Sequence, residues 1–339
     1  MLAPDVPPLT GPPRMHPFTS LVALALDAAC GYPQWVFARI GHPVSWIGRL
    51  IACCERRWNR PHYSFARRRF NGTVSLLMVL AATATACIGF AAAVNLLLPA
   101  PYDVLLLGAA ASTLIAQRSL YDHVAAVARA LDADGLPAGQ HAVGMIVGRD
   151  TARLDEAGVS RAAIESLAEN YSDGVVAPLF WLLVGGLTGA SLYKAVNTAD
   201  SMIGHKNERY RAFGWAAARL DDLVNLPASR LSALFIVIAA AISPGLDAGG
   251  AVRALMRDAR RHRSPNAGWP EAAMAGALGV ALAGPRSYDG KIVDAAWMGD
   301  GRHDLTAADI HRALRLFRLS CLVQALIIGV IALLTLRTF

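Results

Sequence analysis

Three acidic residues recur at a four-residue spacing in the middle of the chain, at Glu165, Glu169 and Asp173. On a helix these positions stand near one face, drifting by about 40° per step. Like charges at this spacing repel by a few tenths of a kcal/mol, and a bound cation would reverse that cost. We therefore predict that Glu169 and Asp173 bind a metal and that Glu165 contacts substrate. The alternatives are a solvated helix face and, for Asp173, an N-cap of an apolar helix starting at Val175.

A polar stretch beginning at Lys194 directly follows a long apolar run. Lys194, Asn197 and Ser201 share a helical face, and Asp200 is adjacent to it. A charge at the end of an apolar run is expensive unless it has a task or a partner. We predict catalytic roles for Lys194 and Asp200 and substrate contacts for Asn197 and Ser201. The alternative is a lysine that snorkels to the membrane surface.

The same stretch continues into Gly204, His205 and Lys206, which predict a turn that presents two cations. Such a turn suits phosphate, through backbone N–H groups and a point charge. We predict that His205 and Lys206 belong to the catalytic site. The alternative is a basic loop beside the membrane.

Two adjacent acids, Asp221 and Asp222, precede the next apolar run. Paired carboxylates can hold Mg²⁺ on a nucleotide. They can equally cap a helix or form salt bridges with Arg219 and Arg230. The sequence leaves both interpretations open, and we count both acids among the catalytic candidates.

Two polar islands and one N-terminal segment complete the set of candidates. Val147–Thr151 is a polar turn in a long connection, and Ser264–Glu271 combines a turn with a helix start that does not by itself require Asn266 or Trp269. Near the N-terminus, His42 lies beside Trp46. The substrate contacts predicted in these segments are Arg149, Asp150, Asn266, Trp269, Glu271 and His42.

The elements that must position these residues are membrane helices. The chain has 339 residues, 55% hydrophobic and only 17% charged, against about 25% charged in soluble domains. Thr73–Leu98 is uncharged and long enough to cross about 30 Å of hydrocarbon, and Val104–Ser119 returns after a short turn. Leu226–Leu246 and Leu316–Leu336 are two further predicted spans.

The weaker apolar runs and the cationic connections limit the topology. Phe18–Cys30 is short and contains Asp27, and Ala272–Ala283 is too short to cross. The connections between runs are basic, which places them on the cytoplasmic face. Val175–Val196 is long enough to cross the membrane, but Gly185–Gly186 divides it. If all the basic connections are cytoplasmic, an alternative to a crossing is that it enters and returns at these glycines as a re-entrant hairpin, which is tolerated where protein buries the backbone or water fills the cavity.

These features predict an all-α, polytopic integral membrane protein with polar catalytic loops and re-entrant helices. We expect residues 1–17, rich in proline, to be a disordered lead and residues 18–339 to form one integral membrane domain. The net charge of +7 is explained by arginines beside apolar runs, so we expect no nucleic-acid partner. The sequence contains no P-loop or H-E-x-x-H motif, so any ATP is bound without a P-loop.

Two long motifs resemble the signature stretches of the adenosylcobinamide-phosphate synthase family of membrane-bound cobalamin biosynthesis proteins. They are SLAENYSDGVVAPLF at Ser166–Phe180 and KAVNTADSMIGHK at Lys194–Lys206. The resemblance covers roughly Leu21 to Gly290, including His42-Pro43-Val44, Val147–Thr151, Asp221-Asp222 and Ser264–Ala275. One departure is Tyr32, where the family pattern has an acid between the glycine and the proline, and this removes support for metal binding at that turn.

The resemblance implies an amide-forming ligase in the bacterial inner membrane whose active site faces the cytoplasm. It joins aminopropanol, or its O-phosphate, to the propionate carboxylate of adenosylcobyric acid, and ATP and Mg²⁺ are expected to drive the reaction. By this resemblance Glu169, Asp173 and Asp200 hold Mg²⁺ or the substrate ammonium group. Lys194, His205 and Lys206 bind phosphate, Asp221 or Asp222 acts as a second metal ligand or a base, and Asn170 contacts substrate.

Two other classes of membrane protein remain as alternatives. A Mg²⁺-dependent transferase of another substrate predicts two acid motifs at similar spacing, and only Asp221-Asp222 partly qualifies. A small-molecule transporter using Asp27, Lys194 and Asp200 predicts inverted repeats, which the sequence does not show. The sequence leaves open whether the chain forms a homo-oligomer.

Overall fold

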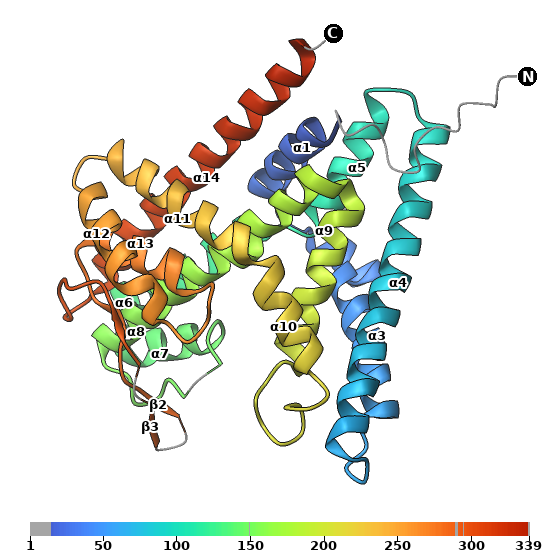
Figure 1. Cartoon of the computed structure of the whole chain (residues 1–339). Helices are drawn as coiled ribbons and strands as arrows, with labels where there is room; N and C mark the ends of the chain where they lie inside the picture. Colours follow the sequence, from blue (N-terminus) through green and yellow to red (C-terminus); the bar gives the residue numbers. More distant parts are fainter. Residues whose placement is uncertain (1–14, 149, 289–290, 294, 338–339) are drawn as a thin grey trace, which may run out of the picture. The chain divides into compact units, whose positions relative to one another are not determined.

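The computed structural model describes residues 15–148, 150–288, 291–293 and 295–337 (Figure 1). Residues 1–14, most of the predicted lead, and Arg149, a predicted substrate contact, lie outside the described residues. The chain is 77% helical with almost no strand, which confirms the prediction of an all-α membrane protein. Its helices form two compact units that alternate along the sequence, and we describe each unit separately.

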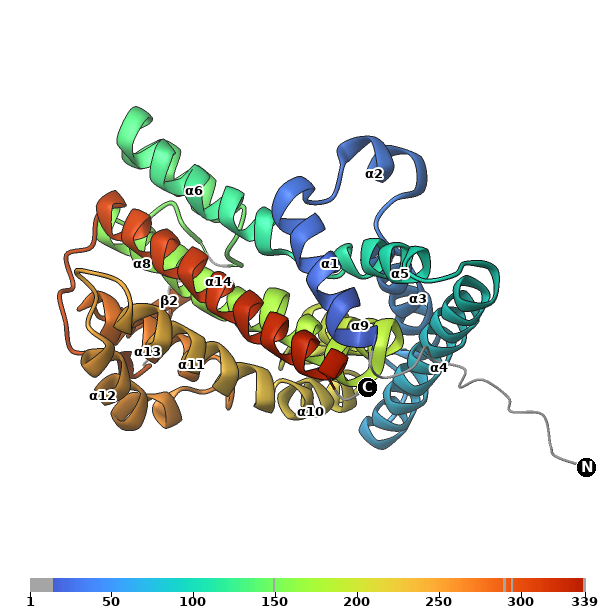
Figure 2. The same ribbon diagram turned by 90° about the horizontal axis from the view of Figure 1, so that it is seen from above.

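Unit 1 comprises residues Met1–Ile115, Ala177–Val224 and Ile328–Phe339. Its helices are α1 (His16–Cys30), α2 (Gln34–Ile40), α3 (Pro43–Trp58), α4 (Phe65–Leu97), α5 (Tyr102–Ser112), α9 (Ala177–Ile203), α10 (Trp215–Val224) and the last part of α14 (Ala307–Arg337). Helices α1 and α5 lie side by side (Figure 2), and a Cβ atom at Gly108 would lie only 2.5 Å from Val22. Glycine at this position therefore allows the close approach.

Helices α3 and α4 form a hairpin (Figure 1) because a short turn at residues 59–64 joins them. The Ser64 side chain caps α4 by accepting a hydrogen bond from the Arg67 N–H. Helices α3, α4, α9 and α10 then enclose one core. Its buried members are Ile51, Leu76, Val79, Ala195, Ala199, Ile203, Phe213 and Ala217.

Helix α9 is interrupted at Gly185 and Gly186, where the backbone leaves helical geometry. Gly186 has φ of 59°, a conformation that favours glycine. The chain folds back at these two glycines. Its two arms approach so closely that a Cβ atom at Gly189 would lie 2.4 Å from the Trp181 carbonyl oxygen. Residues eight apart in a straight helix are separated by about 12 Å. The sequence prediction of a reversal at Gly185–Gly186 agrees with this geometry.

Unit 2 comprises residues Ala116–Val176 and Asn225–Ile327. Its helices are α6 (Gln117–Asp134), α7 (Leu136–Gly144), α8 (Glu156–Tyr171), a π-helical turn (Ser172–Val176), α11 (Leu226–Ala241), α12 (Ala248–Asp258), a 3₁₀ turn (Ala259–Arg261), α13 (Gly268–Leu278) and most of α14. Helix α13 is buried, and its Gly276 approaches Gly250 of α12 so closely that a Cβ atom would lie 2.3 Å from the Gly250 oxygen. This short apolar helix is thus the core of unit 2.

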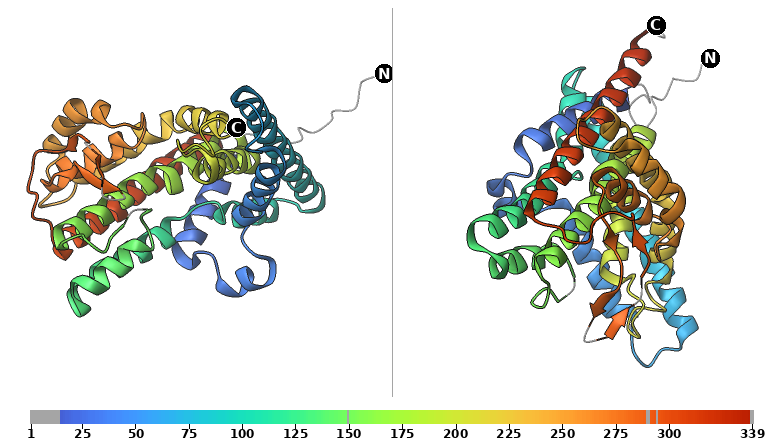
Figure 3. Two further views of the ribbon diagram at one scale, coloured as in Figure 1. Left: turned by 90° about the horizontal axis from the view of Figure 1, so that it is seen from below. Right: turned by 90° about the vertical axis from the view of Figure 1, so that its left-hand side faces the viewer.

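Two small antiparallel strand pairs, which the sequence did not predict, follow α13 in unit 2. Strand β1 (Leu282–Ala283) pairs with β4 (Trp297–Met298), and β2 (Arg286–Tyr288) pairs with β3 (Lys291–Val293). The β2–β3 pair projects from the helices of unit 2 (Figure 3). The β1–β4 pair packs against α8 and α13.

Among the described residues, four helical stretches are long and apolar enough to cross a membrane: Phe65–Leu97, Tyr102–Asp134, Glu156–Ile203 and Ala307–Arg337. There are up to six if each bent helix pair counts as one span, including α1 with Gln34–Trp58, which bend by 106°. The predicted spans Thr73–Leu98 and Leu316–Leu336 are confirmed within these stretches. The predicted span Leu226–Leu246 is too long, because α11 ends at Ala241 and its 16 residues qualify only together with α10.

Candidate functional site

The second arm of α9, after Gly186, carries four of the predicted residues of unit 1. Asn197 donates a hydrogen bond to Asp221 of α10 at 3.4 Å, which joins the two helices at the polar stretch. Ser201 donates to the Asn197 carbonyl oxygen at 2.9 Å. Lys194 is half-buried and lies within electrostatic range of His42, the residue that caps α3. The fold thus brings His42 to a stretch that begins 152 positions later, at Lys194.

A second group of charges forms at the end of α9. Asp200 interacts electrostatically with Asp222, His205 and Arg219. Asp222 also forms a salt bridge with Arg219 at 3.2 Å. Two acids near Arg219 and His205 form a site of mixed polarity. Such a site can bind a cation or a phosphate group, and one of its carboxylates can act as a base. The salt bridge between Arg219 and Asp222, one of the two interpretations that the sequence left open, is therefore present. Asp200 also lies within electrostatic range of the like charge of Asp222.

Two glycines set the path of the turn that follows. Gly204 donates to the Asp200 carbonyl oxygen at 2.7 Å, and a Cβ atom at Gly204 would lie 1.9 Å from the Asp200 carboxylate. A Cβ atom at Gly214 would lie 1.6 Å from the Ile203 carbonyl oxygen. Any side chain at either glycine would displace the backbone. The turn leaves His205 and Lys206 exposed, as an anion-binding turn requires.

The loop 204–214 is also fastened to the α3–α4 hairpin, a feature that sequence reasoning missed. The buried Glu55 carboxylate binds Arg209 through two hydrogen bonds of 3.0 and 3.1 Å. This bidentate pair raises the pKa of Arg209, because its hydrogen bonds and the Glu55 charge favour the protonated guanidinium. The only signal in the sequence was an isolated acid in a strongly basic connection.

In unit 2, the three acids of the first motif occupy different environments. Glu165 is buried and accepts a hydrogen bond from the Ala283 N–H at 2.7 Å. Glu169 is exposed at the end of α8, and Asp173 is half-buried in the π-helical turn. The helix is continuous from α8 into this turn, so no helix begins at Val175 for Asp173 to cap. Because a π-turn has a different spacing from an α-helix, the predicted 40° drift does not extend to Asp173.

Glu165 helps to hold a loop of unit 2 onto α8. Arg161, one turn earlier, donates to the carbonyl oxygens of Ala281 and His303, and its guanidinium lies 5.2 Å from the Trp297 ring centroid. Ala283 itself has φ of 59°, an unfavourable conformation for a residue with a side chain. The Glu165 carboxylate therefore stabilises a strained backbone segment. This contact gives Glu165 a structural role, whatever its role toward substrate.

The predicted Ser264–Glu271 island is bonded to the start of α11. Asn266 is buried, and its side-chain oxygen accepts hydrogen bonds from Ser229 at 3.1 Å and Arg230 at 2.9 Å. The Arg230 guanidinium also lies 4.6 Å from the Trp269 ring centroid. Arg230 is therefore engaged within unit 2 by the island that the sequence singled out.

The remaining candidates of unit 2 are less closely grouped. Glu271 is buried, with His262 Nε2 at 3.8 Å from its carboxylate. Asn170 is exposed and donates to the Ser166 carbonyl oxygen at 2.9 Å. Asp150 is exposed and accepts from the Ala152 N–H at 3.0 Å. The substrate contacts of these three residues therefore stay predictions.

The chemistry of the acids can be compared with what Mg²⁺ requires. Within the described residues, no three His, Cys, Asp or Glu side chains form a group that could hold a metal ion. Mg²⁺ in nucleotide enzymes usually keeps several waters and uses one or two carboxylates together with substrate phosphates. The pair of Asp200 with Asp222 fits that smaller requirement, and Glu169 and Asp173 each offer one carboxylate.

Comparison with known proteins decides the family. Residues 20–317 match the model of the family described as CobD/Cbib protein. The chain belongs to this family. The matched range contains every predicted site residue, from His42 to Glu271.

Curated relatives support the same assignment over most of the CobD/Cbib chain. Cobalamin biosynthesis protein CobD of Rhodobacter capsulatus is 50% identical over 315 residues, covering 93% of this chain and 96% of the relative. The protein of the same name from Rhizobium meliloti is 49% identical, covering 90% and 93%. That from Brucella anthropi is 48% identical, covering 87% and 90%. No solved structure matches this chain.

Proposed function

We propose that this CobD/Cbib protein acts in cobalamin biosynthesis by joining aminopropanol, or its O-phosphate, to the propionate carboxylate of adenosylcobyric acid. The observation that carries the proposal is the family match over residues 20–317, with relatives named cobalamin biosynthesis protein. The mixed charges around Asp200 on α9 and α10 support a chemical role for the polar face of unit 1.

The proposed reaction proceeds in two steps because a carboxylate is a poor acyl donor and must be activated before an amine can attack it. In the first step, a propionate oxygen attacks the γ-phosphorus of ATP, ADP leaves, and an acyl phosphate forms. In the second step, the amine nitrogen attacks the acyl carbon, the bond to phosphate breaks, and inorganic phosphate leaves. Bound Mg²⁺ would supply charge neutralisation on the nucleotide phosphates.

The residues of unit 1 fit the demands of these steps. Lys194, His205 and Lys206 would bind the phosphate groups and the charge that develops on them. Asp221 or Asp222 would act as the base. The ammonium form of the amine must lose a proton before attack, and the nitrogen must lose another one afterwards. Asp200 would hold Mg²⁺ or the substrate ammonium. In unit 2, Glu169 and Asp173 are separate candidates for that role.

The direct test is amide formation by the purified protein in detergent or nanodiscs. Adenosylcobyric acid, ATP and Mg²⁺ are incubated with aminopropanol and, separately, with its O-phosphate, and the products are identified by mass spectrometry. We expect one donor to give an adenosylcobinamide product with stoichiometric release of ADP. Failure of both donors, or amide formation without nucleotide consumption, would contradict the mechanism.

We further propose that the polar loops face the cytoplasm across the bacterial inner membrane, because their arginines flank the spans. Cysteine introduced at exposed Asn207 or Arg263, after removal of exposed Cys30 and Cys53, should resist an impermeant reagent added to intact cells. Cysteine at exposed Tyr102, beyond the far end of α4, is the matched control and should react. Labelling at Asn207 from outside would reverse the proposed orientation.

A further inference from the structure

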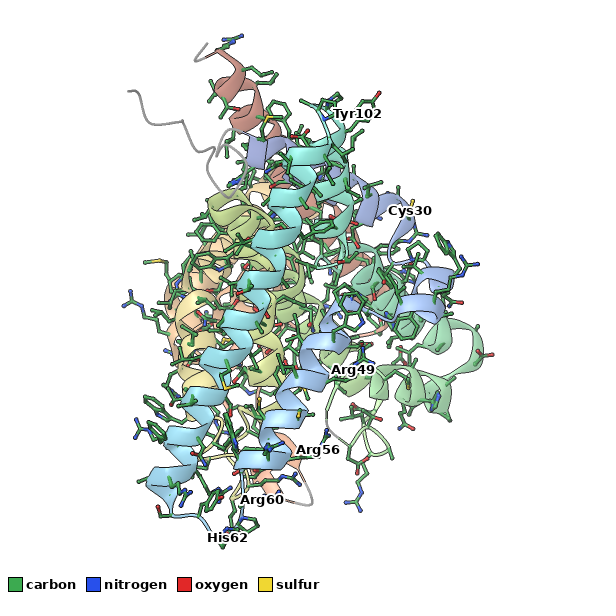
Figure 4. All side chains as sticks on the ribbon, turned by 90° about the vertical axis from the view of Figure 1, so that its right-hand side faces the viewer. Cys30, Arg49, Arg56, Arg60, His62 and Tyr102 are labelled. Carbon is green, nitrogen blue, oxygen red and sulfur yellow. The ribbon has the colours of Figure 1, made fainter. Side chains whose placement is uncertain are left out.

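Unit 1 contains a basic hollow at the end of the α3–α4 hairpin, and none of the predicted catalytic residues is among those that line it. Its volume is about 920 Å³. Arg56, Arg60, Arg68 and Arg209 line it together with Glu55 and Asn59, and we call it the arginine hollow. Figure 4 shows Arg56 and Arg60 near the tip of the hairpin, close to His62 and far from Tyr102.

One wall of the arginine hollow is held by a network of hydrogen bonds. Glu55 binds Arg209 in a bidentate pair, and Asn59 donates to Glu55 at 3.2 Å and to the Arg209 carbonyl oxygen at 3.0 Å. Arg68 donates to the Asn59 side-chain oxygen at 2.8 Å and also to the Arg209 carbonyl oxygen. Because α3, α4 and the loop 204–214 all contribute, this wall is preorganised.

Two further arginines of the lining, Arg56 and Arg60, add positive charge to the hollow. Among the residues that the structure describes, the side chains of Arg56 and Arg60 form no hydrogen bond or ion pair. The lining contains four arginines and two acids, Glu55 and Glu208, which leaves two positive charges in excess. Orientation in the membrane requires arginines on this side, but it does not require a hollow built around a buried carboxylate.

We propose that the arginine hollow binds a phosphate group. Guanidinium groups bind phosphate in planar, bidentate fashion, and Arg56 and Arg60, in the same lining as Arg68 and Arg209, offer several such donor pairs. The volume lies within the range of about 300–1,000 Å³ that is typical of ligand pockets. The phosphate belongs either to an anionic lipid headgroup, because the hollow adjoins the start of membrane helix α4, or to a soluble phosphate compound.

The proposal is independent of the proposed enzymatic function, because the arginine hollow shares no residue with the predicted catalytic set. Its test therefore measures binding and not turnover. The test variant is Arg56→Gln with Arg60→Gln. The charge-matched control is Arg57→Gln with Arg211→Gln, two exposed arginines of the same region that do not line the hollow.

The first arm uses the full chain in nanodiscs of phosphatidylcholine, titrated with inorganic pyrophosphate by calorimetry. The second arm counts phosphatidylglycerol molecules retained by the detergent-solubilised protein in native mass spectrometry. We expect the test variant to give one of two results. Either its affinity for pyrophosphate falls at least about tenfold, or it no longer retains phosphatidylglycerol. The control should match the wild type in both arms, and the arm that responds identifies the source of the phosphate.

The proposal fails if the wild type binds neither probe, or if the test and control variants lose binding equally, which would indicate a general effect of charge. Thermal melts of each variant accompany both arms. If the double variant melts below the wild type, Arg60→Gln alone replaces it, because Arg60 lies beyond the end of α3 at Trp58. Unchanged binding in that variant also overturns the proposal.

Discussion

In unit 1, Asp200 and Asp222 are half-exposed. Asp200 interacts electrostatically with the like charge of Asp222, and also with His205 and Arg219. In unit 2, Glu165 and Asp258 are buried, and each accepts a hydrogen bond from a backbone N–H group. A buried carboxylate whose hydrogen bonds join distant segments is explained by folding alone. A carboxylate that faces another acid has no such explanation, which favours a ligand. The contrast separates acids of unit 2 that fasten distant segments from acids of unit 1 that lie in a cluster of like and opposite charges.

The largest effect should come from Lys194→Met in unit 1. If Lys194 binds substrate phosphate, amide formation should fall by roughly 10²–10³-fold, as for the loss of one charge-stabilising donor. Lys194 also interacts within the protein, so the melting temperature of the apo variant is measured beside its activity. Activity assays and thermal melts with and without ATP make the measurement. Retained activity, or a large loss of apo stability, would place Lys194 with the structural charges instead.

The next effect concerns Asp173, whose half-exposed position in the π-helical turn sets it apart from the buried acids of unit 2. If it binds a divalent ion, Asp173→Asn should lower turnover and raise the Mg²⁺ concentration required by about tenfold or more. A Mg²⁺ titration of the initial rate measures both quantities. A normal Mg²⁺ dependence with an intact rate would show that Asp173 is a solvated residue.

Two acids one turn apart on α8 provide an internal comparison. Glu165→Ala leaves the Ala283 N–H buried without its acceptor, which should cost about 1–3 kcal/mol and lower the melting temperature. Glu169→Ala changes an exposed side chain and should alter stability by less than about 0.5 kcal/mol. Thermal melts of both variants in one detergent make the comparison. Equal melting temperatures would remove the structural role assigned to Glu165.

The smallest expected effect concerns how the stability of the protein changes at acidic pH, and it involves Asp258. Burial alone would raise its pKa, but hydrogen bonds from Arg257 and the Gly299 N–H, with the charges of Arg257 and Arg261, lower it below its usual value. The ionised form therefore contributes stability that is present above about pH 3.9, the unfolded value, and lost as the pH falls through the folded pKa. Asp258→Asn should weaken this acid dependence.

Thermal melts between pH 7 and pH 3 measure the difference between wild type and Asp258→Asn. The gap in melting temperature should be widest near neutral pH and should narrow as the pH falls below about 3.9, because the unfolded chain then binds a proton that the folded Asp258 carboxyl resists. A gap that stays constant over this range would show that the ionisation of Asp258 does not contribute to stability.

The sequence was sufficient wherever the determining interactions are local. The spans within α4 and α14 follow from long apolar runs, because a helix in lipid satisfies its own backbone hydrogen bonds. The reversal at Gly185–Gly186 was also predictable, since Gly186 adopts a backbone conformation that few other residues tolerate. The prediction extended α11 to Leu246, whereas the helix ends at Ala241, shortly before Ser243, Pro244 and Gly245.

Only the tertiary structure distinguished the roles of similar polar residues. Glu165 and Glu169 are equivalent in the sequence pattern, yet one of them bonds to a backbone group 118 positions away. Arg209 reaches Glu55 across 154 positions, and this pair shapes the arginine hollow. Spacing along a helix reports which side chains share a face, but not what that face meets. The partner of a buried charge is supplied by chain segments that no local pattern encodes, and folding alone brings them together.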